Sequence, residues 1–157
     1  MDQVIGIGEY AVSSNINSTI KTYALSTCLA LTAYNSKEKV LGMVHMALPD
    51  SNINQSINAL NPAYYVNTAI PLLIQKTCFL YGCKKQELEL KLFGGAQSIR
   101  KDDLFKIGIR NLEMAEAVLR QLNLRISHYD VGGNKSRTIE ANIATGEIKV
   151  AYQALII

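Results

Sequence analysis

The fold of this chain is decided by the segment Thr22-Tyr-Ala-Leu-Ser-Thr-Cys28-Leu-Ala-Leu-Thr-Ala-Tyr34, Asn35-Ser-Lys-Glu-Lys39, Val40-Leu-Gly-Met-Val-His45-Met-Ala-Leu-Pro49. Two apolar, β-compatible runs, 22–34 and 40–49, flank a short polar break at 35–39. Apolar runs joined by a short polar loop are typical of a β-hairpin. The segment therefore predicts two antiparallel strands that meet at this break.

A cysteine and a histidine lie on the two arms of the predicted hairpin. If the turn is centred between Ser36 and Lys37, Cys28 and His45 are equally far from it and directly opposed. Opposed residues share a face of the sheet, with Cβ atoms roughly 5 Å apart. An imidazole at that distance can take the proton of a thiol, whereas a register slip of one residue would turn one side chain to the other face. The pattern predicts a Cys–His pair of the thiol-hydrolase type.

Each of these residues also has an ordinary structural interpretation. A cysteine among Leu, Ala and Thr in a strand is usually part of the core. A histidine in an apolar run can be a buried imidazole bonded to a backbone carbonyl, although burying a polar ring there is unfavourable. What favours a dyad is that Cys28 and His45 meet across one turn.

A dyad needs a third group that orients the imidazole. Thr22, six residues before Cys28, would face the same side of a straight strand, and the alternative is a β-favouring surface threonine. The backbone amides of Ser26 and Thr27 are candidates for an oxyanion hole, which stabilises the negative charge of a tetrahedral intermediate.

Length and composition exclude several classes of protein. The chain has 157 residues, 48% of them hydrophobic and 18% charged, which predicts one globular domain over residues 1–157. The net charge is +3 and the basic residues are scattered, so we expect no nucleic-acid partner. The N-terminus lacks a secretory signal and no run is long enough to span a membrane, so we expect a cytoplasmic protein without membrane insertion.

The remaining motifs point to no cofactor. Three cysteines without a His or Cys cluster fit neither a disulfide framework nor a zinc site, so we expect free thiols and no metal. The glycine pairs Gly94-Gly95 and Gly132-Gly133 each follow a predicted strand and predict turns with positive φ. Neither pair belongs to a complete phosphate loop, so we expect no nucleotide. We interpret His128 as structural or exposed.

Hydrophobic periodicity predicts two helices among several strands. The helices are expected at 62–81, with Pro62 in the first turn, Pro71 as a kink or break and Gly82 at the exit, and at 112–122, with Asn111 as its cap. The strands are expected within 4–12, as one strand or two short ones, at 88–93 and 124–130, and in a final hairpin of 137–144 and 147–152. The predicted fold is α+β: a largely antiparallel, sandwich-like β-sheet system flanked by two main helices.

These segments, in this order, resemble the chemoreceptor glutamine deamidase family, CheD. The resemblance covers nearly the whole chain and rests on several short motifs: Thr22-x5-Cys28, His45-Met-Ala-Leu-Pro49, Tyr65-x-Asn-Thr-Ala-Ile70, Lys91-Leu-Phe-Gly-Gly-Ala96, Ile107-Gly-Ile-Arg-Asn111, Asp130-Val-Gly-Gly133, Arg137 and Gly146.

The resemblance implies a function and a set of catalytic residues. It implies a protein-glutamine glutaminase that deamidates glutamines of methyl-accepting chemotaxis receptors, with methyl-glutamates as a second candidate substrate. By this match Cys28 is the nucleophile, His45 the base and Thr22 the third member. The family also pairs with the CheC phosphatase in some bacteria, which makes CheC a candidate partner.

Two alternatives stay open at the level of sequence. One is a binding module that regulates receptors or CheC by docking, without catalysis. The other is an amidase for a small metabolite. Thiol reactivity distinguishes the first from an enzyme, because an activated Cys28 with a low pKa is expected to be alkylated faster than Cys78 and Cys83.

Overall fold

The computed structural model describes residues 2–52, 61–97 and 105–155. Within these ranges the chain forms nine strands, two α-helices and one 3-10 helix. The elements are β1 (Asp2–Ile5), β2 (Tyr10–Ser13), β3 (Thr19–Leu25), β4 (Leu29–Asn35), β5 (Val40–Met46), α1 (Val66–Tyr81), the 3-10 helix (Lys85–Glu87), β6 (Glu89–Gly94), α2 (Ile107–Gln121), β7 (His128–Val131), β8 (Lys135–Asn142) and β9 (Ile148–Ala154).

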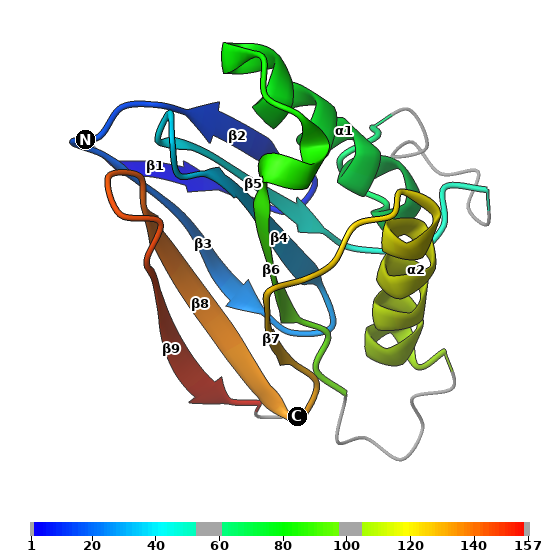
Figure 1. The fold of residues 1–157 in the computed structure, drawn as a ribbon. Helices are drawn as coiled ribbons and strands as arrows, with labels where there is room; N and C mark the ends of the chain where they lie inside the picture. The colour runs from blue at the N-terminus through cyan, green and yellow to red at the C-terminus, as the bar shows by residue number, and fades with distance from the viewer. Residues whose placement is uncertain (1, 53–60, 98–104, 156–157) are drawn as a thin grey trace.

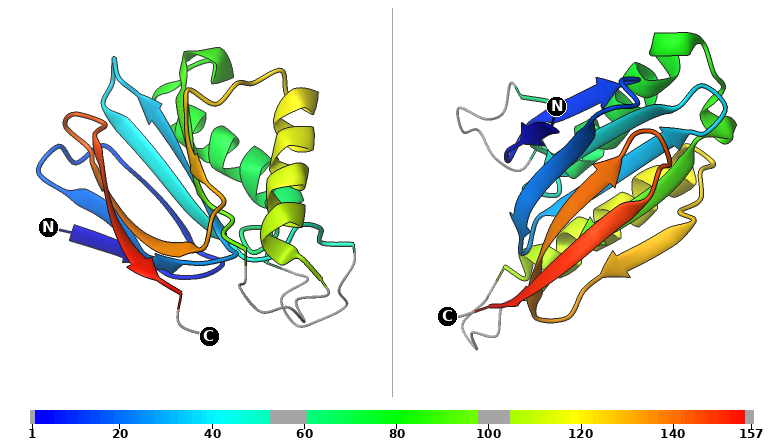
Figure 2. Two further views of the ribbon diagram at one scale, coloured as in Figure 1. Left: turned by 90° about the horizontal axis from the view of Figure 1, so that it is seen from below. Right: turned by 90° about the vertical axis from the view of Figure 1, so that its left-hand side faces the viewer.

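The strands form two sheets that stack face to face. The four-stranded sheet has the order β1-β3-β8-β9 and the five-stranded sheet the order β2-β5-β4-β6-β7. Both helices cover the outer face of the five-stranded sheet (Figure 1), and Figure 2 shows the resulting three layers. The pairs β1–β3 and β6–β7 are parallel and the other strand pairs are antiparallel. The predicted α+β fold with a largely antiparallel, sandwich-like sheet system is confirmed.

Alternation along β4 and β5 divides the interior into two apolar clusters. Leu29, Leu31 and Val44 pack against the two helices, whereas Ala30 and Met43 pack between the two sheets. Because successive side chains of a strand point to opposite faces, His45 belongs to the same face as Met43. The five-stranded sheet is therefore buried on both sides at its centre, which is why β4 and β5 read as nearly continuous apolar runs.

The predicted hairpin is confirmed, but its predicted register is wrong. Asn35 pairs with Val40, and His45 lies opposite Ala30 rather than Cys28. The turn starts later than expected because the Asn35 side chain accepts hydrogen bonds from the Lys37 and Glu38 amides, and Lys39 adopts a left-handed conformation. The centre of the turn moves by one residue. That displaces each partner by two positions and so preserves the face of each side chain.

The expectation of one straight arm from Thr22 to Tyr34 is also wrong. The arm is broken into β3 and β4, which belong to different sheets. The pairing of β3 with β8 shifts between Thr22 and Leu25, and Ala24 in this bulge has a φ of 55°. Bulges bend a strand and end its pairing. Residues 26–28 therefore cross from one sheet to the other.

Both helices start at positions other than those predicted. α1 begins at Val66 instead of Pro62, because Tyr65 is still extended, and Pro71 lies inside the helix without splitting it. Gly82 ends α1 in a left-handed conformation, as predicted. α2 begins at Ile107 behind a left-handed Lys106, so Asn111 is inside the helix and is not its cap.

The remaining predictions have mixed outcomes. The final hairpin is confirmed as β8 and β9. The region 4–12 contributes to two short strands, β1 and β2, which belong to different sheets. β7 begins four residues later than expected. The glycines of both pairs have positive φ. None of the helices within the described ranges combines the length and hydropathy that crossing a membrane requires.

Candidate active site

The predicted base and the predicted third residue contact each other across the two sheets. Thr22 of β3 is fully buried and His45 of β5 is 2% exposed. The Thr22 Oγ1 and His45 Nδ1 atoms are 2.7 Å apart. The sequence predicted that Thr22 orients the imidazole from the same strand as Cys28. The structure brings it there from the opposite sheet.

The hydroxyl of Thr22 defines the tautomer of the imidazole. Its single proton is donated to the backbone carbonyl of Ile5, at 2.9 Å. The same oxygen can then only accept from His45, so Nδ1 of His45 carries the proton. The neutral ring therefore has its lone pair on Nε2, and that buried atom has no hydrogen-bond partner within the described part of the chain. A free, correctly oriented ring nitrogen is what a general base requires.

The backbone of His45 is held by the β1–β2 turn as well as by β4. Its amide donates to the carbonyl of Glu9 at 3.1 Å, and its carbonyl accepts from the amide of Gly8 at 2.8 Å. On its other side it is paired with Ala30 of β4. The position of the imidazole is therefore determined by the main-chain hydrogen bonds of His45 to the β1–β2 turn, by its place in the β4–β5 pair and by the Thr22 hydroxyl.

The predicted nucleophile lies at the end of the segment that crosses between the sheets. Cys28 is half-buried and packs against the inter-sheet apolar cluster. Cys28 directly precedes β4 and lies two residues before Ala30, which is the cross-strand partner of His45. Cys28 is therefore a diagonal neighbour of His45 across the two strands. Cys28 and His45 are not hydrogen bonded, because Nε2 of His45 has no partner among the described residues. Catalytic hydrogen bonds are often long in a free enzyme and shorten when substrate binds.

Burial keeps both groups neutral. It raises the pKa of the Cys28 thiol to about 11, and a hydrogen bond from the Cys28 backbone amide to the sulfur is a smaller, opposite effect. Burial also lowers the pKa of His45 to about 4. At neutral pH the pair is thus a thiol beside a neutral imidazole. The pKa of Cys28 in the free protein is therefore raised rather than lowered, because burial disfavours the charged thiolate.

Three consecutive carbonyls of the crossing segment accept hydrogen bonds. The carbonyls of Ser26 and Cys28 accept from the backbone amides of Ala96 and Gly95, each at 2.8 Å. The carbonyl of Thr27, between them, accepts from Nδ2 of Asn111 at 2.9 Å. With its carbonyls fixed, the segment is held in one conformation around the thiol.

Sequence reasoning missed Asn111, which it assigned to a helix cap. The side chain is fully buried, and its Nδ2 donates to the carbonyl of Ala47, at 3.1 Å, as well as to that of Thr27. The available signal was the spacing Gly108-x-x-Asn111. A Cβ on Gly108 would lie 2.2 Å from the carbonyl oxygen of Ala96, so only glycine lets the start of α2 approach this loop. Asn111 follows within one helical turn, on the side that meets the crossing segment.

The family to which this chain belongs follows from a comparison with known proteins. Residues 47–152 match the family model of CheD, described as CheD chemotactic sensory transduction. This is more than half of the chain. The chain belongs to the CheD family. The matched range begins after Thr22, Cys28 and His45, so the geometry above is an observation independent of that match.

Relatives of this CheD-family protein match over nearly its whole length. One, named a probable chemoreceptor glutamine deamidase CheD, from Syntrophotalea carbinolica, is 39% identical over 152 residues, covering 96% of this chain and 93% of the relative. A second of the same name, from Pyrococcus horikoshii, is 40% identical over 149 residues, covering 93% and 89%. A third, named chemoreceptor glutamine deamidase CheD, from Thermotoga maritima, is 36% identical over 150 residues, covering 96% and 91%.

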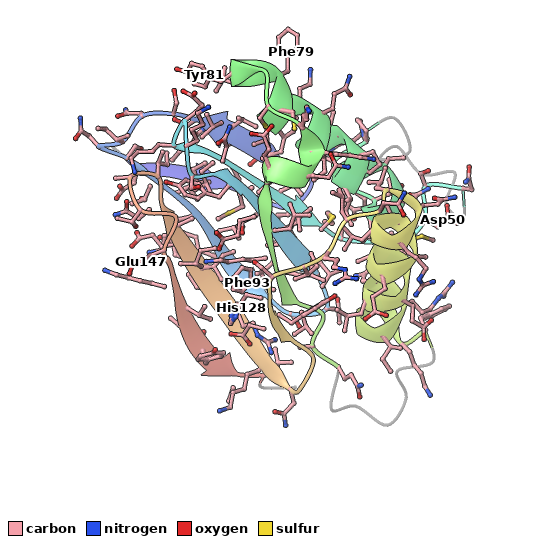
Figure 3. The ribbon with its side chains drawn as sticks, in the orientation of Figure 1. Asp50, Phe79, Tyr81, Phe93, His128 and Glu147 are labelled. Atoms are coloured by element: carbon pink, nitrogen blue, oxygen red, sulfur yellow. The ribbon has the colours of Figure 1, made fainter. Side chains whose placement is uncertain are left out.

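The other candidate groups of this CheD-family protein lie apart from the Cys28, His45 and Thr22 site. His128, interpreted as structural or exposed, is exposed on β7. Its ring lies 6.0 Å from that of Phe93, and Figure 3 shows the two side by side. Cys78 and Cys83 are free thiols that pack against the helix-side cluster. The described residues contain no group of three or more side chains suited to hold a metal ion.

Proposed function

We propose that this protein deamidates glutamine side chains of chemoreceptors through Cys28, His45 and Thr22. One observation carries the proposal: the Thr22 hydroxyl donates to the Ile5 carbonyl and accepts from Nδ1 of His45. Nε2 of the imidazole is therefore the proton acceptor, on the face of β5 that looks toward the nucleophile segment. The names of the relatives, which identify them as chemoreceptor glutamine deamidases, supply the substrate class.

The first half of the reaction is acylation of the thiol. A glutamine carboxamide enters beside Cys28, and Nε2 of His45 takes the thiol proton as the sulfur attacks the carboxamide carbon. A tetrahedral oxyanion forms, with the Cys28 backbone amide as a candidate donor to it. His45 then returns the proton to the nitrogen, the carbon–nitrogen bond breaks and ammonia leaves. A thioester between Cys28 and the former glutamine side chain remains.

The second half is hydrolysis of the thioester. His45, again neutral, takes a proton from water as the water oxygen attacks the thioester carbon. Collapse of the intermediate expels the thiolate, which recovers its proton from the imidazolium. The products are a glutamate side chain and the free thiol of Cys28. Because the pKa of Cys28 is raised, proton transfer accompanies attack, and no stable thiolate precedes it.

The same steps accommodate a methyl-glutamate. The sulfur then attacks the ester carbon, His45 protonates the departing oxygen and methanol leaves in place of ammonia. We include methyl ester hydrolysis as a second activity of the same site, and CheC as a partner, within this proposal.

The test is an assay with a receptor cytoplasmic fragment that carries both glutamines and methyl-glutamates. Ammonia and methanol release are followed together with the mass of the fragment, for the native protein and for Cys28→Ala. We expect the alanine variant to lose both activities. Cys78→Ala is the matched control, because Cys78 is a free, partly buried thiol on α1, and it should remain active.

The outcome also separates this proposal from the alternatives. Equal activity of native protein and Cys28→Ala would remove Cys28 as nucleophile. Binding of the receptor fragment or of CheC without ammonia or methanol release by the native protein would favour a docking module. Hydrolysis of small free amides with no change in the receptor fragment would favour a metabolite amidase.

A further inference from the structure

We infer that Asn111 is a positioning residue for the reaction: its side-chain amide sets the direction of the Cys28 backbone N–H and ties the nucleophile segment to the strand that carries His45. The inference rests on the proposed function of Cys28 and His45. Asn111 touches neither the thiol nor the imidazole by hydrogen bond. It acts through the residues next to them, Thr27 and Ala47.

The orientation of the Asn111 amide is determined by its two partners. Both are backbone carbonyls, at 2.9 Å and 3.1 Å from Nδ2, and a carbonyl only accepts. The NH₂ end of the amide must therefore face them. Both of its protons are used, one toward the segment before Cys28 and one toward the chain just after β5. The Asn111 side chain is fully buried and donates to two separate backbone segments. It therefore holds those segments at a defined spacing.

The hydrogen bond to Thr27 acts on Cys28 because the peptide unit is planar. In a trans peptide the C=O of one residue and the N–H of the next point in opposite directions. Asn111 holds the Thr27 carbonyl on the α2 side, so the N–H of Cys28 points away from α2. The same N–H favours the negative charge of the Cys28 sulfur, because its effect on the pKa of the thiol is a lowering, opposite to that of burial. A donor fixed beside the nucleophilic sulfur is where a tetrahedral oxyanion would need one.

The hydrogen bond to Ala47 acts on His45. Ala47 is two residues beyond the imidazole and directly follows the last residue of β5. The same amide thus connects the end of the base-carrying strand to the residue that precedes the nucleophile. The side chains of Cys28 and His45 share no hydrogen bond within the described part of the chain. Asn111 connects their two segments through one side chain.

The test compares two substitutions of Asn111 with a buried asparagine elsewhere. Asn111→Leu keeps the approximate volume and removes both donors, and Asn111→Ser keeps a hydroxyl that is too short to span both carbonyls. The control is Asn35→Ala, because Asn35 is 3% exposed and its side chain binds two backbone amides in the β4–β5 turn. Initial rates of ammonia release from the receptor fragment give kcat and KM, measured well below the melting temperature of each variant.

We expect kcat of both Asn111 variants to fall roughly 100-fold with KM changed by less than about threefold, since misplacing a donor or a reacting group has effects of this size. Asn35→Ala should lose thermal stability but keep kcat. If Asn111→Leu does not fold, Asn111→Ser carries the test. A kcat for the folded Asn111 variants equal to that of Asn35→Ala would overturn the inference. Activity in Cys28→Ala would instead overturn the proposed function, so the two failures are distinguishable.

Discussion

At the scale of single residues, the site depends on a hydroxyl that can donate only once. Thr22 donates to the carbonyl of Ile5 and must accept from His45, so its hydroxyl determines the tautomer of the imidazole. A carboxylate in this place would do the same and would also stabilise the imidazolium. A threonine hydroxyl carries no charge and does not stabilise the imidazolium in this way. This agrees with the pKa of His45, which burial lowers to about 4. His45 is therefore neutral at neutral pH, and in the proposed reaction it is charged only during turnover.

Removal of the Thr22 hydroxyl tests this assignment. In Thr22→Val the Nδ1–H of His45 and the carbonyl of Ile5 lose their shared partner, and the neutral ring is free to adopt the other tautomer. We expect kcat to fall by roughly 10- to 1,000-fold and stability to fall by about 1–3 kcal/mol. Thr22→Ser keeps the hydroxyl and should retain most of the activity. Loss of activity in Thr22→Ser equal to that in Thr22→Val would contradict the hydrogen-bonding role.

The buried imidazole also predicts how stability depends on pH. Folding lowers the pKa of His45 to about 4, from about 6.5 in an unfolded chain. Between these values the unfolded chain binds a proton that the folded protein does not. The stabilising contribution is therefore complete above about pH 6.5 and is lost as the pH falls toward about 4. Urea unfolding of the native protein should show this acid-side loss. His45→Gln should show a shallower slope over the same range, and equal slopes would refute the prediction.

At the scale of elements, the site depends on how closely α2 approaches the loop after β6. Gly94 and Gly95 both have positive φ, and a Cβ on Gly94 would lie 2.2 Å from the carbonyl oxygen of Cys28. Gly108 has the corresponding role on the helix, facing Ala96. The glycines at these two elements permit the backbone contacts that hold residues 26–28. The motifs at 91–96 and 107–111, on which the resemblance to the family rests, are thus explained by packing around the crossing segment, residues 26–28.

A methyl group on Gly108 should therefore impair catalysis through packing. In Gly108→Ala the new Cβ would overlap the carbonyl of Ala96, which forces the start of α2 away from the loop and disturbs the contacts of Asn111. We expect a loss of about 1–3 kcal/mol in stability together with a kcat at least tenfold lower. Gly82→Ala is the control, because Gly82 has a φ of 69° with open space around it. It should lose about 1 kcal/mol and keep its kcat.

At the scale of the whole molecule, a polar cluster connects the two sheets. Arg137 of β8 donates through Nε to Asp130 of β7, at 3.0 Å, and through Nη2 to the carbonyl of Gly132, at 2.9 Å. Tyr152 of β9 also donates to Asp130. β7 belongs to the five-stranded sheet, and β8 and β9 belong to the other. The Arg137 and Asp130 side chains are 7% and 19% exposed, so this ion pair is largely shielded from water, and like Thr22 and His45 it connects the two sheets.

Breaking this pair should weaken the whole sandwich. Arg137→Met leaves Tyr152 as the remaining partner of the Asp130 carboxylate among the described contacts. Removal of one partner from a fully buried ion pair typically costs about 3–5 kcal/mol, and we expect a smaller loss of about 1–3 kcal/mol here, because Asp130 is 19% exposed. We expect a correspondingly lower urea midpoint with a cooperative transition. Glu89→Gln is the control, because the Glu89–Lys91 pair is more exposed, at 49% and 21%, and should change stability by less than about 1 kcal/mol. A similar, small effect for both variants would show that Arg137 is not a bridge between the sheets.

Local patterns in the sequence were sufficient to predict most of the elements and to propose the reacting groups. Alternation and turn residues predicted the hairpin, the two helices and the final strand pair, because these features have periods of a few residues. They also predicted that Cys28 and His45 share a face, because successive side chains of a strand alternate between the two faces of a sheet and a register shift of two positions leaves the face unchanged. Register and helix starts were less well predicted. The Asx turn at Asn35 and the left-handed Lys106 are single-residue effects that periodicity does not contain.

The assembly of the site was decided only by the tertiary structure. Thr22 reaches His45 from another sheet because a bulge near Ala24 breaks the arm that the sequence suggested was continuous. Asn111 reaches Thr27 from 84 residues along the chain. Contacts of this kind depend on how separate elements pack, and no local spacing encodes them. The sequence by itself determined which side chains are candidates for the proposed chemistry, because residue types and their spacing are local information. Packing determined the tautomer of His45 and the contact between Asn111 and the segment before Cys28.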